Sequence, residues 1–90
     1  MGWRIEWDEG ALKDLKGFDR QAQRRIVRFM AERVATRPDP RTIGRALTGP
    51  LGEFWRYRVG PYRIVCRIEG DRLVVLVVRV GHRREVYRTP

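Results

Sequence analysis

The last eleven residues, VGHRREVYRTP, combine residue types that could act on a phosphodiester. They contain His82, the single histidine of the chain, followed by Arg83, Arg84 and Tyr87. Arginine binds phosphate through its guanidinium fork, a tyrosine ring stacks on a base, and imidazole titrates near neutral pH. Together these types are what a groove that binds and cuts RNA requires. Each also has a structural explanation, because a lone histidine is more often a surface residue than a catalyst.

A second group of arginines alternates with apolar residues in FWRYRV and YRIVCRIE. Successive side chains of a β-strand point to opposite faces, so these segments predict two strands with one apolar face each. Burial of a large apolar side chain stabilises a fold by about 1.5–3 kcal/mol, which leaves the arginines on the other face. Like charges on one surface repel, and a bound anion would relieve that repulsion. These arginines are Arg56, Arg58, Arg63 and Arg67.

Two helices are predicted in the N-terminal half, after a short strand. WRIEW, at 3–7, alternates with a period of two, as expected of a half-buried strand. Asp8 is a candidate N-cap for a first helix that ends at Gly17. Asp19 is a candidate N-cap for a second helix, whose apolar residues recur at helical spacing until Pro38 stops the pattern.

Three more strands are predicted in the second half. Residues 38–53 are rich in glycine and proline and are expected to form a loop. The strands that follow are joined at 60–61 and 69–71 by turns short enough for antiparallel hairpins, and 85–87 is a candidate for a short fifth strand. The predicted fold class is α+β: an antiparallel β-sheet with two N-terminal helices packed on one face, in the order β-α-α-β-β-β. We expect one domain, 1–90.

The chain is strongly basic, which indicates a polyanionic partner. Its 20 Lys+Arg against 11 Asp+Glu give a formal net charge of +9. Nearly all of these cations are arginine, which suits bidentate phosphate contacts, although a GC-rich genome would also favour arginine codons. The outward face of the second helix is either a binding stripe or a solvated face, and we favour the solvated face; it carries Arg20, Arg24, Arg25 and Arg28.

Several classes of protein are not favoured by the sequence. Cys66 is the single cysteine, so no internal disulfide can form, and its place in the strand pattern predicts a packing role. No metal-ligand spacing or carboxylate cluster is visible, so we expect neither a metal nor another cofactor. No apolar stretch reaches the roughly 18 residues of a membrane span, and the N-terminus lacks a signal-peptide core. We therefore expect a cytoplasmic protein with no membrane partner.

Taken together, ALKDLKGFD and LTGPLGEFWRYRVGPYRIVCRIEGDRLVVLVVRVGHRREVY resemble the RelE side of the RelE/ParE toxin superfamily of toxin–antitoxin systems. The resemblance spans nearly the whole chain and is most specific in WRYRVGPYRIVCRI and VGHRREVY. It implies an endoribonuclease that cuts mRNA in the ribosomal A site, without metal, by attack of the ribose 2′-hydroxyl on the adjacent phosphate. It also implies a cognate, RelB-like antitoxin, with the ribosome and mRNA as further partners.

The resemblance also implies roles for individual residues. The two basic positions on the strand before the GPYR-type turn fall on Arg56 and Arg58, and the phosphate-stabilising arginine falls on Arg63. The proton-donating arginine falls on Arg83 and the base-stacking tyrosine on Tyr87. In the best-studied relatives the first two positions are lysine. Arginine stays protonated and is a poor general base, so the role expected here shifts toward electrostatic stabilisation.

The proton acceptor is therefore left open, with His82 as a candidate because imidazole can accept a proton near neutral pH. Arg67 and Arg84 are expected to bind RNA without a catalytic role. Two other functions remain as alternatives. A ParE-like toxin of the same fold would inhibit DNA gyrase by binding, without nuclease activity. A plain nucleic-acid-binding module would keep the charge but would not need these residues to converge.

Overall fold

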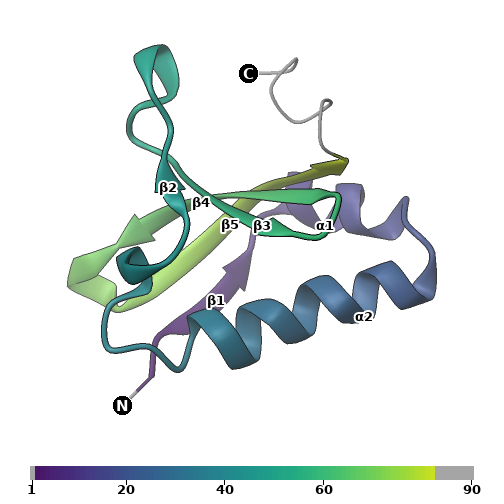
Figure 1. Ribbon diagram of the computed structural model, residues 1–90, viewed down its shortest axis with the longest axis horizontal. Coiled ribbons are helices and arrows are strands. Elements are labelled where there is room, and N and C mark those ends of the chain that lie inside the picture. The colour runs from purple at the N-terminus through teal and green to yellow at the C-terminus, as the bar shows by residue number, and fades with distance from the viewer. Residues whose placement is uncertain (1, 83–90) are drawn as a thin grey trace.

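Five strands form one mixed sheet with the order β1-β5-β4-β3-β2 in the computed structural model, which describes residues 2–82. The strands β3, β4 and β5 are antiparallel neighbours, as predicted; β2, in the segment expected to be a loop, adds an antiparallel edge strand, and β1 runs parallel to β5 (Figure 1). A hairpin forces its strands to be antiparallel, but β1 reaches β5 through a long connection that permits parallel pairing. The strands are β1 (Arg4–Trp7), β2 (Arg45–Ala46), β3 (Trp55–Val59), β4 (Tyr62–Glu69) and β5 (Val74–His82).

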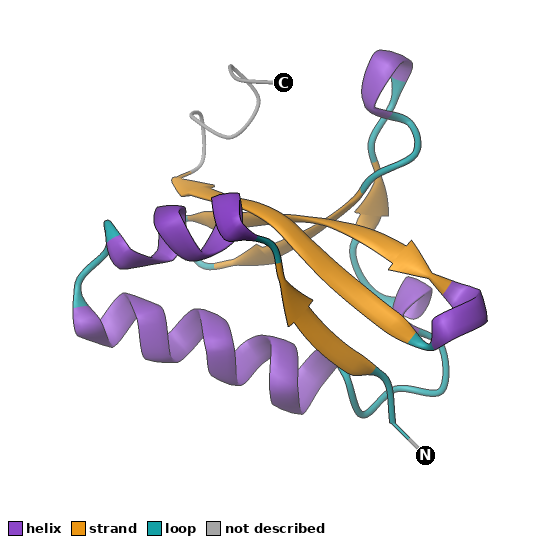
Figure 2. Cartoon of the chain, turned by 180° about the vertical axis from the view of Figure 1, so that it is seen from behind, coloured by secondary structure: helices purple, strands orange, loops and turns teal. Residues whose placement is uncertain are grey.

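The predicted α+β class is confirmed, and both helices lie on one face of the sheet (Figure 2). They are α1 (Glu9–Lys16) and α2 (Arg20–Phe29), and a π-helical turn, Met30–Val34, continues α2. The carboxylate of Asp19 accepts a hydrogen bond from the backbone N–H of Ala22 at 2.8 Å, which confirms the predicted N-cap. No helix within 2–82 is long and apolar enough to cross a membrane.

The core lies between the helices and the sheet. Ile64 and Val75 are inaccessible to solvent, whereas Trp55 and Tyr62 are only half-buried. Other buried members of the core are Ala11 and Leu15 from α1, Ile26 from α2, Met30 and Val34 from the π-helical turn, and Tyr57, Cys66, Val77 and Val80 from the sheet. The apolar face that strand periodicity predicted for β3 and β4 is therefore the face that the helices cover.

A β-bulge changes which side chains of β5 face the core. Ile64 pairs with Val80 and Cys66 pairs with Val77, so β5 contains one residue more than β4 between these pairs. Such an extra residue reverses the alternation of all later side chains. The strand continues through Gly81 to His82, and the bulge determines on which face His82 lies.

The carboxylate of Asp14 on α1 covers the edge of β5 where β1 has ended. It accepts a hydrogen bond from the backbone N–H of Val80 at 2.9 Å and lies 2.8 Å from Nε of Arg79. Edge strands leave backbone groups unpaired, so this side chain takes the place of a neighbouring strand. It also fixes the end of β5, next to the start of the C-terminal segment.

We expect Asp14→Ala to lower the free energy of unfolding by about 2 kcal/mol, because it leaves the Val80 N–H without its charged acceptor. The half-exposed Arg79 should contribute a smaller part. Urea denaturation of Asp14→Ala, Arg79→Ala and the double variant would measure both contributions. A change below about 0.5 kcal/mol in Asp14→Ala, the range of ordinary surface substitutions, would contradict this role.

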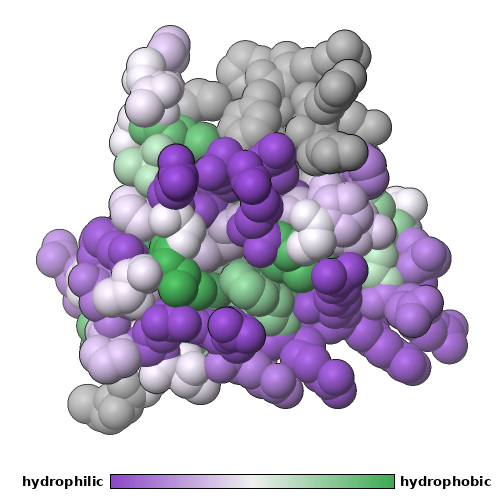
Figure 3. Space-filling model, viewed as in Figure 1, coloured by the Kyte–Doolittle hydropathy of each residue, from purple (hydrophilic) through white to green (hydrophobic). Residues whose placement is uncertain are grey.

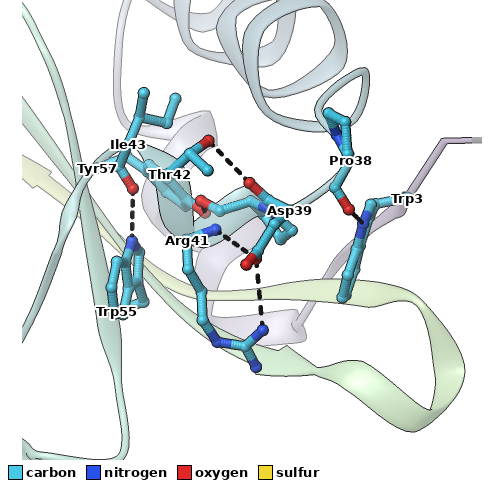
Figure 4. A network of polar contacts seen from close by, with 9 residues as sticks. Trp3, Pro38, Asp39, Arg41, Thr42, Ile43, Trp55 and Tyr57 are labelled. Atoms are coloured by element: carbon cyan, nitrogen blue, oxygen red, sulfur yellow. Dashed lines mark hydrogen bonds and ion pairs between the residues drawn. The ribbon is translucent and has the colours of Figure 1, made fainter.

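Three side-chain donors hold the loop 38–43 against the sheet (Figure 4). The backbone carbonyls of Pro38, Pro40 and Ile43 accept hydrogen bonds from Trp3 Nε1 at 3.0 Å, Tyr57 Oη at 2.7 Å and Trp55 Nε1 at 2.8 Å, respectively. The chain then passes close to β3 at Gly44, where φ is +80° and a Cβ would lie 2.5 Å from the carbonyl oxygen of Arg56. Only glycine can lie so close to β3 with this backbone conformation, and β2 begins at the next residue.

Cys66 is fully buried, and this burial raises the pKa of its thiol far above the ordinary range. The thiol therefore ionises more readily in the unfolded chain than in the folded one. The free energy of unfolding should be constant below about pH 8.5 with respect to this group and should fall as the pH rises above that value. We expect Cys66→Ala to be less stable at pH 7 but to lose less stability between pH 8.5 and 9.5. Urea denaturation at these pH values is the measurement, and an unchanged pH dependence in the variant would contradict it.

Candidate active site

Strand register brings two predicted site residues into direct opposition on the face away from the helices. Arg58 on β3 pairs with Arg63 on β4, and Arg63 pairs on its other side with Gly81 on β5. Directly opposed residues of antiparallel strands point to the same face, so the two guanidinium groups share one surface. Arg56 belongs to the same face, two pairs further along β3. Three of the predicted catalytic arginines therefore gather there.

These arginines differ in their exposure. Arg58 is exposed, whereas Arg56 and Arg63 are half-buried, so the expectation that all three face solvent holds fully only for Arg58. The Nη1 atom of Arg63 is buried. Burial restricts the rotamers of a long side chain, and a guanidinium held in one orientation needs little reorganisation to stabilise a developing negative charge. This burial makes Arg63 a candidate for that role.

Arg67 lies on the same face of β4 but in a different environment. Its Nη2 atom lies 3.8 Å from a carboxylate oxygen of Glu53, and its guanidinium carbon lies 5.6 Å from the ring centroid of Phe54. An exposed ion pair of this length is weak, and an RNA phosphate could replace the carboxylate. Arg67 is exposed, and its role in binding RNA stays a prediction.

His82 does not join the arginines. It pairs with Tyr62, and its ring centroid lies 5.9 Å from that of Tyr62, which itself contacts the ring of Phe18 at 5.1 Å. The β-bulge places His82 on the helix-covered face, opposite to that of Arg63. The structure thus separates the candidate proton acceptor from the arginines that it was expected to assist.

The other predicted residues of the C-terminal segment, Arg83, Arg84 and Tyr87, lie outside the described residues, as does the candidate strand at 85–87. Within 2–82, no three His, Cys, Asp or Glu side chains come together in an arrangement that could hold a metal ion.

The sequence analysis missed Arg45, which lies on the edge strand β2 and pairs directly with Arg56. Both residues line a cavity of about 420 Å³ together with Arg33, Arg58 and Phe29. A strand of two residues carries no detectable periodicity, and Arg45 lies in the segment that glycine and proline content predicted to be a loop. The chain offered no signal that would have placed Arg45 beside Arg56.

Comparison with known proteins identifies the family of this chain. Residues 5–87 match the family described as ParE toxin of type II toxin–antitoxin system, parDE. The chain belongs to this family and is a RelE-like toxin of the RelE/ParE superfamily. Toxin RelG of Mycobacterium tuberculosis is 26% identical to this toxin over 88 residues, which cover 98% of this chain and 99% of RelG.

Solved structures of other toxins share its fold. The toxin–antitoxin complex RelBE2 from M. tuberculosis superimposes with a TM-score of 0.84 at 24% identity, covering 94% of this chain and 95% of that chain. A mutant of E. coli toxin RelE in complex with the antitoxin peptide RelBc gives a TM-score of 0.72 at 25% identity, covering 98% and 93% of the two chains. The family and fold implied by the sequence resemblance are thus confirmed.

Proposed function

We propose that this toxin inhibits translation as a ribosome-dependent, metal-independent mRNA endoribonuclease in the cytoplasm. The observation that carries the proposal is the opposition of Arg58 and Arg63, with Arg56 beside them, on the sheet face that the helices leave uncovered. Three neighbouring guanidinium groups form a site for a phosphate on which negative charge develops. The similarity to Toxin RelG and to RelE supports the nuclease branch of the superfamily.

In the proposed reaction the ribose 2′-oxygen attacks the adjacent phosphorus and the bond from phosphorus to the 5′-oxygen breaks. The products are a 2′,3′-cyclic phosphate and a free 5′-hydroxyl. Arg63 stabilises the charge on the non-bridging phosphate oxygens, while Arg56 and Arg58 neutralise the phosphodiester during the attack. Arg83 donates a proton to the leaving 5′-oxygen, and Tyr87 stacks on a base next to the cleaved bond.

We propose that the proton of the 2′-hydroxyl passes to solvent, because no side chain within 2–82 on this face is suited to accept it, and that Arg83 regains from solvent the proton that it gives to the leaving oxygen. The permanently charged Arg56 and Arg58 are poor bases, and His82 lies on the other face of the sheet. The reaction therefore depends on the orientation of the 2′-hydroxyl, which can contribute about 7–11 kcal/mol when the reacting atoms are held in line. We propose that the ribosome imposes this orientation on mRNA, which explains why cleavage would require it.

The proposed protein partner is a RelB-like cognate antitoxin. E. coli RelE has been solved with a peptide of its antitoxin RelBc, and this toxin shares that fold over 98% of its length. With a net charge of +9, its surface is complementary to an acidic segment. The antitoxin would inhibit the toxin by covering the basic surface.

Inhibition of DNA gyrase by binding is the second candidate, and the match to a family described by its ParE toxins favours it. One experiment separates the two functions: purified toxin is incubated with translating ribosomes, with the same mRNA free in buffer, and with gyrase and supercoiled DNA. Primer extension should show cuts only in the ribosomal sample. Gyrase inhibition without mRNA cleavage would reject the proposed nuclease, and equal cleavage of free mRNA would reject its dependence on the ribosome.

A further inference from the structure

A second basic surface adjoins the proposed catalytic face, between α2 and the β3–β4 turn, and shares Arg58 with it. A cavity of about 710 Å³ opens there, and five arginines line it: Arg24, Arg25 and Arg28 from α2, Arg33 from the π-helical turn and Arg58 from β3. Hydrophilic side chains cover the α2 side of the molecule. A hydrophobic strip separates them from a second group of hydrophilic side chains near the sheet edge (Figure 3). We call this cavity the α2 groove. The face that the sequence analysis treated as solvated thus borders a concave site.

The α2 groove continues around the sheet edge toward the catalytic arginines. The neighbouring cavity of about 420 Å³ shares Phe29, Arg33 and Arg58 with it and adds Arg45 and Arg56. The path exists because β2 pairs with β3 only at Arg56 and Trp55, so β2 does not cover the rest of the β3 edge. Arginines therefore line a continuous surface from α2 to the proposed site of cleavage.

The α2 groove carries an excess of positive charge, which favours the binding of an anion. Its lining includes one carboxylate, Glu32, which lies 3.6 Å from Nε of Arg28 in an exposed and therefore weak ion pair. Another guanidinium, that of Arg25, lies against the turn: a Cβ on Gly60, where φ is +58°, would be 2.7 Å from Arg25 Nη2. Glycine at this turn lets Arg25 approach the backbone, so the shape of the groove depends on it.

We propose that the α2 groove binds the phosphate backbone of the substrate RNA beyond the cleaved bond. The inference rests on the proposed function, which supplies the RNA. Continuity with Arg56 and Arg58 favours one RNA strand that runs through both cavities. Five planar guanidinium groups suit bidentate phosphate contacts, and Phe29 on the floor between the cavities offers an apolar surface for a base.

The test uses uncleavable 2′-O-methyl RNA, so that its readout does not depend on activity. Fluorescence anisotropy would compare a 4-mer, which is long enough for the catalytic face alone, with a 12-mer. Arg24→Gln/Arg28→Gln removes two charges from the groove, and Lys13→Gln/Lys16→Gln removes two charges from exposed positions on α1 as the matched control. Glutamine has nearly the same helix propensity as arginine and lysine, so all proteins should fold.

We expect the groove variant to bind the 12-mer about tenfold more weakly and to lower the slope of log K against log salt by about 1.4, or about 0.7 for each lost phosphate contact. Its affinity for the 4-mer, and the control's affinity for both RNAs, should change less than twofold. Equal losses in both variants would show a non-specific charge effect and overturn the inference. Unchanged RNA binding in the groove variant, with weaker binding of either the antitoxin or empty ribosomes, would also overturn it and assign the groove to that partner. Neither result would affect the proposed cleavage, which is measured separately.

Discussion

Arg63→Ala should slow single-turnover cleavage of ribosome-bound mRNA by about 10²–10³-fold, equivalent to about 3–4 kcal/mol of transition-state stabilisation. The half-buried guanidinium is held on β4 directly opposite Arg58, where the scissile phosphate would lie. A contact that strengthens as charge develops acts on the chemical step, so the rate at saturating toxin should fall while ribosome binding changes little. Growth arrest after induction should disappear in parallel.

Lys13→Ala is the matched control, because it removes one positive charge from an exposed position on α1. If net charge alone determined activity, both substitutions would weaken RNA binding about equally through lost counterion release. Arg63→Lys adds a further distinction, because it keeps the charge but loses the planar fork and should be intermediate. All three variants must first show the wild-type thermal transition. Equal defects in Arg63→Ala and Lys13→Ala would show that the arginine face of the sheet is only a basic binding surface, and the catalytic assignment of Arg63 would be withdrawn.

Tyr57→Ala should have the largest effect on stability, lowering the free energy of unfolding by about 3–5 kcal/mol, as for other large aromatic residues in cores. Tyr57 stands between Arg56 and Arg58 in the chain, but its side chain is completely buried. The centroid of its ring lies 6.1 Å from that of Phe29. Its hydroxyl donates a hydrogen bond of 2.7 Å to the carbonyl of Pro40. Loss of the ring would leave a cavity under β3 and release the loop that leads to β2.

Tyr57→Phe separates the two contributions, because it retains the ring and removes the hydrogen bond. We expect it to cost about 1–2 kcal/mol, since the buried Pro40 carbonyl loses its donor. In urea denaturation, Tyr57→Ala should therefore unfold at a much lower midpoint than Tyr57→Phe, which should lie slightly below wild type. Equal losses in the two variants would mean that the hydrogen bond alone stabilises this region, contrary to the packing argument.

Local patterns in the sequence were sufficient to predict most elements and one face of the site. The alternation in β3 and β4 placed Arg56, Arg58 and Arg63 together because a strand has a period of two whatever it pairs with. The cap at Asp19 was predictable for a similar reason, since its acceptor oxygen serves a backbone N–H only three residues away. Predictions of this kind depend on neighbours along the chain.

The sequence by itself therefore determined the α+β class, the strands of the arginine face and the family resemblance. Only the tertiary structure decided the parallel pairing of β1 with β5, the role of Arg45 in β2 and the α2 groove. It also separated His82 from Arg63, because one extra residue in β5 reverses the side-chain alternation after the bulge. Strand pairing, bulges and the meeting of a helix with a sheet edge depend on contacts between segments far apart in the chain. Periodicity within one segment contains no information about such contacts.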